Sequence, residues 1–279
     1  MSPEPGTAND APPDPGASGA IRRLRAQTGQ RYYLSVPAAG GRAAPVVVVV
    51  HGISRNAREH VRAFAPLAQQ YGAVLVAPRF GRARFPDYQR LGRSGRGERA
   101  DLALQRILAE VARDTGACTD KVFLFGFSGG GQFVHRFALA HPQRVAAYVV
   151  GAAGWYTFPD PQLPYPRGTR CTRTMPDTAF DLRAFLRVPA TVLVGERDTD
   201  QGAALRKSTK VIEQQGASRV ERGRRWVEAM KAACAERGLP DHFGYRTLPR
   251  SAHSFREAMR LDAIAELTME ALLGDRAGD

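Results

Sequence analysis

The sequence has little cysteine and no long apolar run. Three cysteines, Cys118, Cys171 and Cys234, occur in 279 residues. An odd number of cysteines cannot all pair within one chain, which argues against a disulfide framework and favours a reducing compartment. No stretch approaches the roughly eighteen consecutive apolar residues that a transmembrane helix needs. We therefore expect no contact with a membrane.

The first residues also lack what an exported protein needs. Residues 1–20, MSPEPGTANDAPPDPGASGA, are rich in Pro, Gly, Ala and Ser, without the basic and apolar segments of a secretory signal. We predict a disordered leader over 1–20, a single catalytic domain over 21–279 and a cytoplasmic location. With 43% hydrophobic residues, the rest of the chain can bury a substantial core.

Lysine is nearly absent, although the formal net charge is +13. A strongly basic chain raises nucleic acid as a partner, but no nucleic-acid-binding motif accompanies the charge, so we expect none. Arginines are densest in one stretch after a predicted strand, which either attracts an anionic substrate or is a solvated basic loop; we favour the loop. These arginines are Arg79, Arg82, Arg84, Arg90, Arg93, Arg96 and Arg99.

Apolar runs and helical patterns alternate along the chain, which predicts an α/β fold with a mainly parallel sheet and helices on both faces. The expected strands are 31–37, 45–52, 73–78, 121–127, 144–152, 190–196 and 243–249. The expected helices are 57–72, 100–116, one ending near 140, 220–237 and a last one carrying Leu261 to Leu272. The aromatic, Pro-rich stretch after Gly154 breaks this rhythm, and we predict a cap-like insert over 155–188.

Ser128 lies in a glycine-rich segment where we predict a sharp turn of the chain. The segment Gly126-Phe127-Ser128-Gly129-Gly130 matches G-x-S-x-G between a predicted strand and a predicted helix, the context that this motif requires. Glycines remove the clashes of a strained turn, and the helix N-terminus faces developing negative charge. Ser128 is therefore a candidate nucleophile, although glycine-rich turns of this kind also bind phosphates.

A serine nucleophile needs a base, and the base needs a group to orient it. Asp198 follows one buried strand and His253 follows the last strand, giving the chain order Ser, Asp, His. All three would lie at the carboxyl ends of parallel strands, where open α/β sheets gather their sites. Asp200 and Glu196 share the loop with Asp198 and stay open as alternatives. Among the other histidines, which are His51, His60, His135, His141 and His242, only His242 precedes a strand closely enough to compete.

The sequence VVVVVHGISRNA supplies a further expected component. The His51-Gly52 pair at a strand end lets the chain turn beneath the nucleophile. The backbone N–H of Ile53 can then join that of Gly129 as an oxyanion hole, unless this is an ordinary strand-to-helix turn.

With these residues the chain resembles the α/β-hydrolases from about residue 30 to 273. HGISRNA and the single-domain form are similar to esterases of the polyhydroxybutyrate-depolymerase and dienelactone-hydrolase type. A dienelactone hydrolase would carry cysteine in place of Ser128, and a secreted depolymerase would carry a signal. The resemblance implies a serine hydrolase that cleaves small or polymeric carboxylic esters through Ser128, His253 and Asp198 and an acyl-enzyme.

The resemblance implies no cofactor and no metal, and the sequence contains no H-E-x-x-H or paired-cysteine motif. Trp155, Tyr156 and Phe158 of the insert are candidates for lining an acyl pocket, with packing onto the sheet as the alternative. A peptidase or acyltransferase on the same scaffold, and an inactive hydrolase fold that binds nucleic acid or acts as a scaffold, are the other functions considered.

Overall fold

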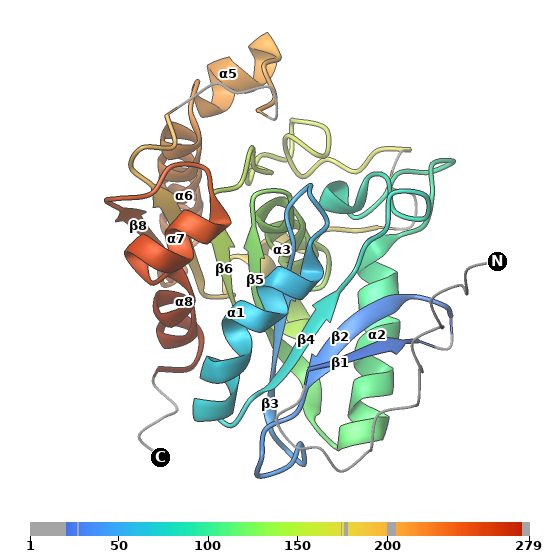
Figure 1. The fold of residues 1–279 in the computed structure, drawn as a ribbon. Helices are drawn as coiled ribbons and strands as arrows, with labels where there is room; N and C mark the ends of the chain where they lie inside the picture. The colour runs from blue at the N-terminus through green and yellow to red at the C-terminus, as the bar shows by residue number, and fades with distance from the viewer. Residues whose placement is uncertain (1–20, 27, 174, 176–177, 200–204, 275–279) are drawn as a thin grey trace, which may run out of the picture.

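The computed structural model describes residues 21–26, 28–173, 175, 178–199 and 205–274 (Figure 1). Within this part of the chain, one eight-stranded sheet has the order β1-β2-β4-β3-β5-β6-β7-β8. The strands are β1 (Arg22–Arg25), β2 (Arg31–Ser35), β3 (Pro45–Val50), β4 (Val74–Pro78), β5 (Cys118–Phe127), β6 (Val145–Gly151), β7 (Ala190–Gly195) and β8 (Phe243–Leu248). The six neighbouring strands β4, β3, β5, β6, β7 and β8 pair in parallel. The β1–β2 and β2–β4 pairs are antiparallel. The predicted, mainly parallel sheet is confirmed.

Helices cover both faces of the sheet, as predicted. They are α1 (Ala57–Gln70), α2 (Ala100–Thr115), α3 (Gly129–Ala140), α4 (Leu182–Phe185), α5 (Thr209–Gln215), α6 (Arg219–Ala235), α7 (Phe255–Asp262) and α8 (Ile264–Leu273), with short 3₁₀ helices η1 (Tyr88–Arg90) and η2 (Pro142–Arg144). None of the helices in the described residues is long and apolar enough to cross a membrane.

The side chains of the central strand β3 pack against the helices on both faces of the sheet. Successive strand side chains point to opposite faces. Val46, Val48 and Val50 accordingly join the core beneath α2, α3 and α6, while Val47 and Val49 join the core beneath α1, α7 and α8. All five valines are fully buried, so the valine run belongs to a strand covered on both faces.

Two details differ from the sequence-based expectations. Strand β1 begins at Arg22, directly after the predicted leader, whose residues 1–20 lie outside the described part of the chain. The expected last helix is two helices, because Ala263 adopts a left-handed conformation with φ of 49°. An alanine gives no sequence signal for such a break, since the left-handed region normally favours glycine.

The insert after β6 is mainly irregular and is held against the body of the protein. The indole N–H of Trp226 in α6 donates to the Thr157 carbonyl at 2.8 Å. The Tyr165 hydroxyl donates to the Arg90 carbonyl, also at 2.8 Å. These two bonds tie the insert to α6 on one side and to η1 on the other.

Candidate active site

Ser128 occupies a strained turn between β5 and α3. Its backbone has φ of 55° and ψ of −111°, and its N–H donates to the Gly151 carbonyl of β6 at 2.7 Å. A Cβ atom on Gly126 would overlap the Gly130 carbonyl, and one on Gly130 would overlap the Val50 carbonyl of β3. The glycines therefore let three strands and a helix meet closely enough to hold the serine in this conformation.

The hydroxyl of Ser128 lies in a chain of hydrogen bonds with two residues distant in sequence. His253 Nε2 is 3.0 Å from Ser128 Oγ, and His253 Nδ1 is 2.7 Å from Asp198 Oδ2. A carboxylate accepts hydrogen bonds only, so Nδ1 carries the proton and Nε2 of the neutral ring accepts from the serine hydroxyl. The structure thus brings together the serine, the histidine and the acid that the sequence singled out.

The three side chains differ in their exposure to solvent. Asp198 is 1% exposed and Ser128 is 9% exposed, whereas His253 is partly open to solvent. The imidazole ring stacks on Phe127 with ring centroids 5.4 Å apart. The acid is therefore shielded from water, while the histidine can reach a bound molecule.

The second oxygen of Asp198 has a partner that the sequence analysis missed. Arg219 Nη1 lies 3.0 Å from Asp198 Oδ1, and both side chains are almost fully buried. Arg219 is the first residue of α6, whose N-cap Ser218 forms a capping box with Glu221. The capping pattern was visible in the sequence, but nothing marked this arginine among the many others.

The two expected oxyanion donors lie beside Ser128. The Ile53 nitrogen is 3.3 Å from the position that a Cβ atom would take on Gly129. Gly129 is the first residue of α3, so its N–H has no partner within the helix. Among the described residues, neither backbone N–H has a hydrogen-bond acceptor. The two donors are therefore available to a ligand.

His51 has a structural role at the turn after β3, as the sequence suggested. Its Nδ1 donates to the Gly52 carbonyl at 2.8 Å, and its Nε2 accepts from the Phe80 N–H at 3.0 Å. Burial lowers the pKa of His51 to about 3, so the ring stays neutral. The Tyr88 hydroxyl donates to the His51 carbonyl at 3.0 Å and fixes the end of β3.

The rival residues lie elsewhere or outside the described chain. Glu196 accepts from the Thr247 hydroxyl at 2.6 Å, while Asp200 is outside the described residues. His242 is exposed, and it directly precedes β8 at the amino end of the strand. The His242 side chain therefore cannot reach Ser128, which lies at the carboxyl ends of the parallel strands.

The aromatic side chains proposed for substrate binding have separate environments. Tyr156 is fully buried and stacks on Trp226 with centroids 5.0 Å apart, so it belongs to the core and not to an open pocket. Phe158 packs against the same core cluster. Trp155 does line a cavity of about 240 Å³ with Tyr165. Of the three candidates, Trp155 is therefore the one that lines this cavity.

In the basic stretch 79–99, four of the seven arginines pair with acids and one packs on an aromatic ring. Arg84 pairs with Glu98 at 2.6 Å, and Arg93 pairs with Asp87 at 3.0 Å. Arg90 lies over the Trp155 ring, 5.3 Å from its centroid. Two further ion pairs in this region are Arg96–Asp87 and Arg99–Asp101. These four arginines are therefore held by partners within the protein, whereas no ion pair involves Arg79 among the described residues.

The described residues contain no group of three or more His, Cys, Asp or Glu side chains that could hold a metal ion. The three cysteines are free, with Cys234 buried and the other two exposed. The chemistry available at this site is thus that of the serine, the histidine and the acid.

Comparison with known proteins identifies structural relatives only. No protein-family model matches the chain, and no curated protein matches it in sequence. Poly(aspartic acid) hydrolase-1 from Sphingomonas sp. KT-1 superposes with a TM-score of 0.75 and 26% identity, covering 88% of this chain and 99% of the other. LpqC, a poly(3-hydroxybutyrate) depolymerase from Bordetella parapertussis, also has a TM-score of 0.75 and 26% identity, with 91% of each chain covered.

A more distant structure shares the fold alone. An S-formylglutathione hydrolase from Agrobacterium tumefaciens has a TM-score of 0.59 and 15% identity, covering 90% of this chain and 94% of the other. Together with the sheet order and the turn at Ser128, these similarities define the chain as an α/β-hydrolase. The two structures at 26% identity support a place in the esterase-like branch of that superfamily. One is named a hydrolase and the other a depolymerase, which supports hydrolase activity for this chain.

Proposed function

We propose that this protein is a serine hydrolase that cleaves carboxylic esters through Ser128, His253 and Asp198. The observation that carries the proposal is the continuous hydrogen-bonded path from Ser128 Oγ through both ring nitrogens of His253 to Asp198. A serine hydroxyl is a weak nucleophile until a base accepts its proton, and this path supplies that base in the required tautomer.

In the proposed first step, Ser128 Oγ attacks the ester carbonyl carbon while its proton moves to His253 Nε2. The carbonyl oxygen becomes an oxyanion, which the N–H groups of Ile53 and Gly129 stabilise. Asp198 holds the imidazolium by charge and by its hydrogen bond to Nδ1. When the tetrahedral intermediate collapses, the alcohol leaves with the proton from Nε2, and the acyl group remains on Ser128.

In the second step, water takes the place of the alcohol. His253 accepts a proton from the water as its oxygen attacks the acyl carbon, and the same two N–H groups stabilise the new oxyanion. Collapse breaks the bond to Ser128 Oγ, which regains its proton from His253. The products are a carboxylic acid and the free enzyme.

The choice of an ester over an amide depends on the leaving group. One structural relative is named for a polyester and the other for poly(aspartic acid), so both kinds of acyl bond are hydrolysed by proteins of this architecture. The same residues would support a peptidase or, with an alcohol in place of water, an acyltransferase. We propose the ester as the substrate because an alkoxide leaves more readily than an amide nitrogen.

The test is hydrolysis of short p-nitrophenyl esters by the purified chain. We expect activity that Ser128→Ala reduces by a factor of about 10³ or more. Ser94→Ala, at an exposed serine outside the site, serves as the control and should retain the wild-type rate. A Ser128→Ala rate equal to that of the wild type would contradict the assignment.

A covalent probe tests the same site independently of substrate choice. A fluorophosphonate should label Ser128, as located by peptide mass spectrometry, and His253→Ala should strongly slow the labelling because the hydroxyl loses its base. Labelling of another serine would move the site elsewhere.

A further inference from the structure

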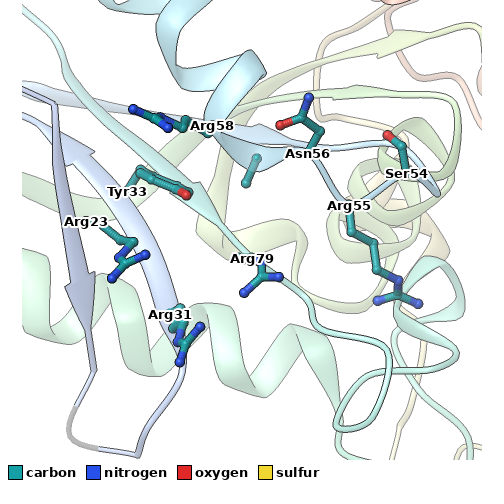
Figure 2. A pocket seen from close by; sticks show the side chains of 9 residues that line it. Arg23, Arg31, Tyr33, Ser54, Arg55, Asn56, Arg58 and Arg79 are labelled. Atoms are coloured by element: carbon teal, nitrogen blue, oxygen red, sulfur yellow. The ribbon is translucent and has the colours of Figure 1, made fainter. Parts of the chain in front are cut away.

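A cavity of about 670 Å³ opens beside the Ile53 turn and is lined by five arginines. Figure 2 shows that they come from separate elements. Arg23 lies on β1 and Arg31 on β2, Arg79 directly follows β4, Arg58 is in the first turn of α1, and Arg55 belongs to the turn after β3. We call this the arginine pocket.

Four of these guanidinium groups are free to bind an anion. Arg23, Arg31, Arg58 and Arg79 are exposed, and among the described residues none of them has an acidic partner. Like charges that share one cavity repel each other, and a bound anion would relieve that repulsion. This pocket therefore differs from the stretch 84–99, where four of the five arginines pair with an acid.

The acid nearest to the pocket along the chain is Glu59. Its Oε2 accepts from Nδ2 of Asn56, a lining residue, at 3.0 Å, and its Oε1 lies 3.5 Å from Arg256 Nη2. Glu59 thus pairs with residues other than the four exposed arginines. Within the described part of the chain, none of those four arginines forms an ion pair.

The backbone holds the walls of the pocket in place. The Arg79 N–H donates to the Arg31 carbonyl at 2.9 Å, which keeps these two residues side by side. The buried side chain of Gln30 donates to the Arg79 carbonyl at 2.6 Å. The pocket is therefore built before any ligand arrives, and binding needs little ordering of the main chain.

Arg55 has a supporting role within the pocket. Its guanidinium donates to the carbonyls of Phe80 and Phe85 and lies over the Tyr88 ring, 4.9 Å from the centroid. These contacts fix the turn that carries both Ile53 and the pocket wall. The turn after β3 therefore carries one wall of the pocket and one of the proposed oxyanion donors.

The arginine pocket lies at the same edge of the sheet as Ser128. Ser128 follows β5, the turn at Ile53 follows β3, Arg79 follows β4, and Arg31 begins the antiparallel β2 at the same edge of the sheet. With strands about 4.8 Å apart, Arg79 lies roughly 10 Å and Arg31 roughly 14 Å from the strand that carries Ser128. An extended chain of a few repeating units would cover this distance.

We propose that the arginine pocket is a substrate subsite, which binds carboxylates carried along an oligomeric acyl substrate while its ester carbonyl lies at Ser128. This inference rests on the proposed function. Guanidinium groups bind carboxylates through paired, charge-assisted hydrogen bonds. Free guanidiniums spread over β1, β2, α1 and the end of β4 suit several separated anionic groups better than one compact phosphate.

The experiment compares pairs of p-nitrophenyl esters of equal chain length, one ending in a carboxylate and the other in a methyl ester. The measured quantity is the ratio of kcat/KM for the anionic ester to that for the neutral ester, across a series of increasing length. In the wild type we expect this ratio to rise once the chain is long enough to reach Arg79. Added salt should lower the ratio, because exposed charges are screened.

Variants test whether the arginine pocket causes the higher kcat/KM for the anionic ester. The double variant Arg31→Gln/Arg79→Gln should lower the ratio by about tenfold or more. Arg79→Lys keeps the charge and should lose less than Arg79→Gln. Arg187→Gln is the matched control, because Arg187 is an exposed arginine on the loop before β7, at the opposite edge of the sheet, and should leave the ratio unchanged.

The outcomes separate this inference from the proposed function. Neutral esters that are cleaved by a Ser128-dependent reaction, with a ratio that the double variant does not change, would overturn the subsite and leave the serine hydrolase intact. No Ser128-dependent cleavage of any ester would overturn the proposed function itself. In a competition assay, oligo-glutamate should inhibit the wild type more than the double variant. Inhibition by inorganic phosphate but not by oligo-glutamate would overturn the assignment to carboxylates.

Discussion

Arg219 and His253 share the carboxylate of Asp198. Arg219 Nη1 lies 3.0 Å from Oδ1, and His253 Nδ1 lies 2.7 Å from Oδ2. The acid is fully buried, so the arginine compensates a charge that would otherwise be costly to remove from water. The bond to Oδ1 also fixes the plane of the carboxylate, which sets the direction of Oδ2. Arg219 is in this sense a positioning residue for the proposed reaction.

Replacement of this arginine has two expected effects. Arg219→Gln should destabilise the protein by about 3 kcal/mol, because it leaves a buried carboxylate with one partner fewer. It should also shift the acid limb of the kcat/KM profile to higher pH, because an uncompensated Asp198 attracts the protonated imidazole more strongly. Urea unfolding and pH–rate profiles measure the two effects separately.

Arg222 provides the structural control. It is also buried in α6, but it donates to the carbonyls of Gly216 and Gly154 and not to Asp198. Arg222→Gln should therefore destabilise the fold without moving the acid limb. A profile that shifts equally in both variants would show that loss of stability alone explains the effect.

The turn at Ser128 should tolerate no side chain at Gly130. A methyl group there would overlap the Val50 carbonyl, so Gly130→Ala should push α3 away from β3 and disturb the hydroxyl. We expect a loss of more than about 2 kcal/mol of stability, together with most of the proposed esterase activity. Gly81→Ala is the control, since no atom lies within 4 Å of the added methyl group. Equal stability of the two variants would contradict the close contact.

The proposed oxyanion donor at residue 53 can be removed by a residue that the turn accommodates. The Arg55 N–H donates to the Gly52 carbonyl at 3.0 Å, which makes Ile53 the second residue of a β-turn, a position where proline is favoured. Ile53→Pro removes the N–H together with the isoleucine side chain and should lower kcat by about 10²–10³. Ile53→Ala keeps the N–H, and since the native side chain is 46% exposed, its loss should be much smaller. Similar losses in both variants would argue against a backbone donor here.

Buried histidines should make the fold sensitive to acid. His60 Nδ1 donates to the Asn56 carbonyl at 3.1 Å, and its ring stacks on Phe255 with centroids 4.0 Å apart. Burial lowers the pKa of His60 from 6.5 to about 4. The unfolded chain therefore takes up the proton first, and the free energy of unfolding falls as pH drops from 6.5 towards 4.

The size of this effect follows from the two pKa values. Between about pH 7.5 and pH 5, His60 should account for a loss of about 2 kcal/mol. His60→Phe keeps the stacking and should reduce the acid-induced loss by that amount in urea titrations. His242→Gln, at an exposed histidine, should follow the wild type. An unchanged loss in His60→Phe would show that this ring is not the sensitive group.

Sequence reasoning reached the fold and three candidate site residues that the structure brings into contact, because their signals are local. The glycines around Ser128 mark a sharp turn, and Asp198 and His253 follow strands that apolar runs reveal. The choice between Asp198 and Asp200 stayed open, because a loop sequence does not say which carboxylate turns towards the histidine. In the structure, Asp198 contacts the ring of His253.

What sequence reasoning missed depends on contacts between distant segments. Arg219 lies 21 positions from Asp198, and only the packing of α6 against β7 and β8 brings the two side chains together. Tyr156 looked like a pocket residue, since aromatic residues line pockets and cores alike. The pairing of Arg84 with Glu98 likewise requires the loop to fold back on itself. No local pattern encodes these relations.

The antiparallel pair β1–β2 has a consequence for how this scaffold can change. It contributes Arg23, Arg31 and Tyr33 to the arginine pocket, whereas Ser128, Asp198 and His253 all follow strands of the parallel region. Part of the proposed subsite therefore lies on strands that carry none of the three proposed catalytic residues. If the subsite acts as proposed, exchange of the short β1–β2 hairpin for one with other side chains would change which substrates are preferred without replacing Ser128, Asp198 or His253, a route open to both evolution and engineering.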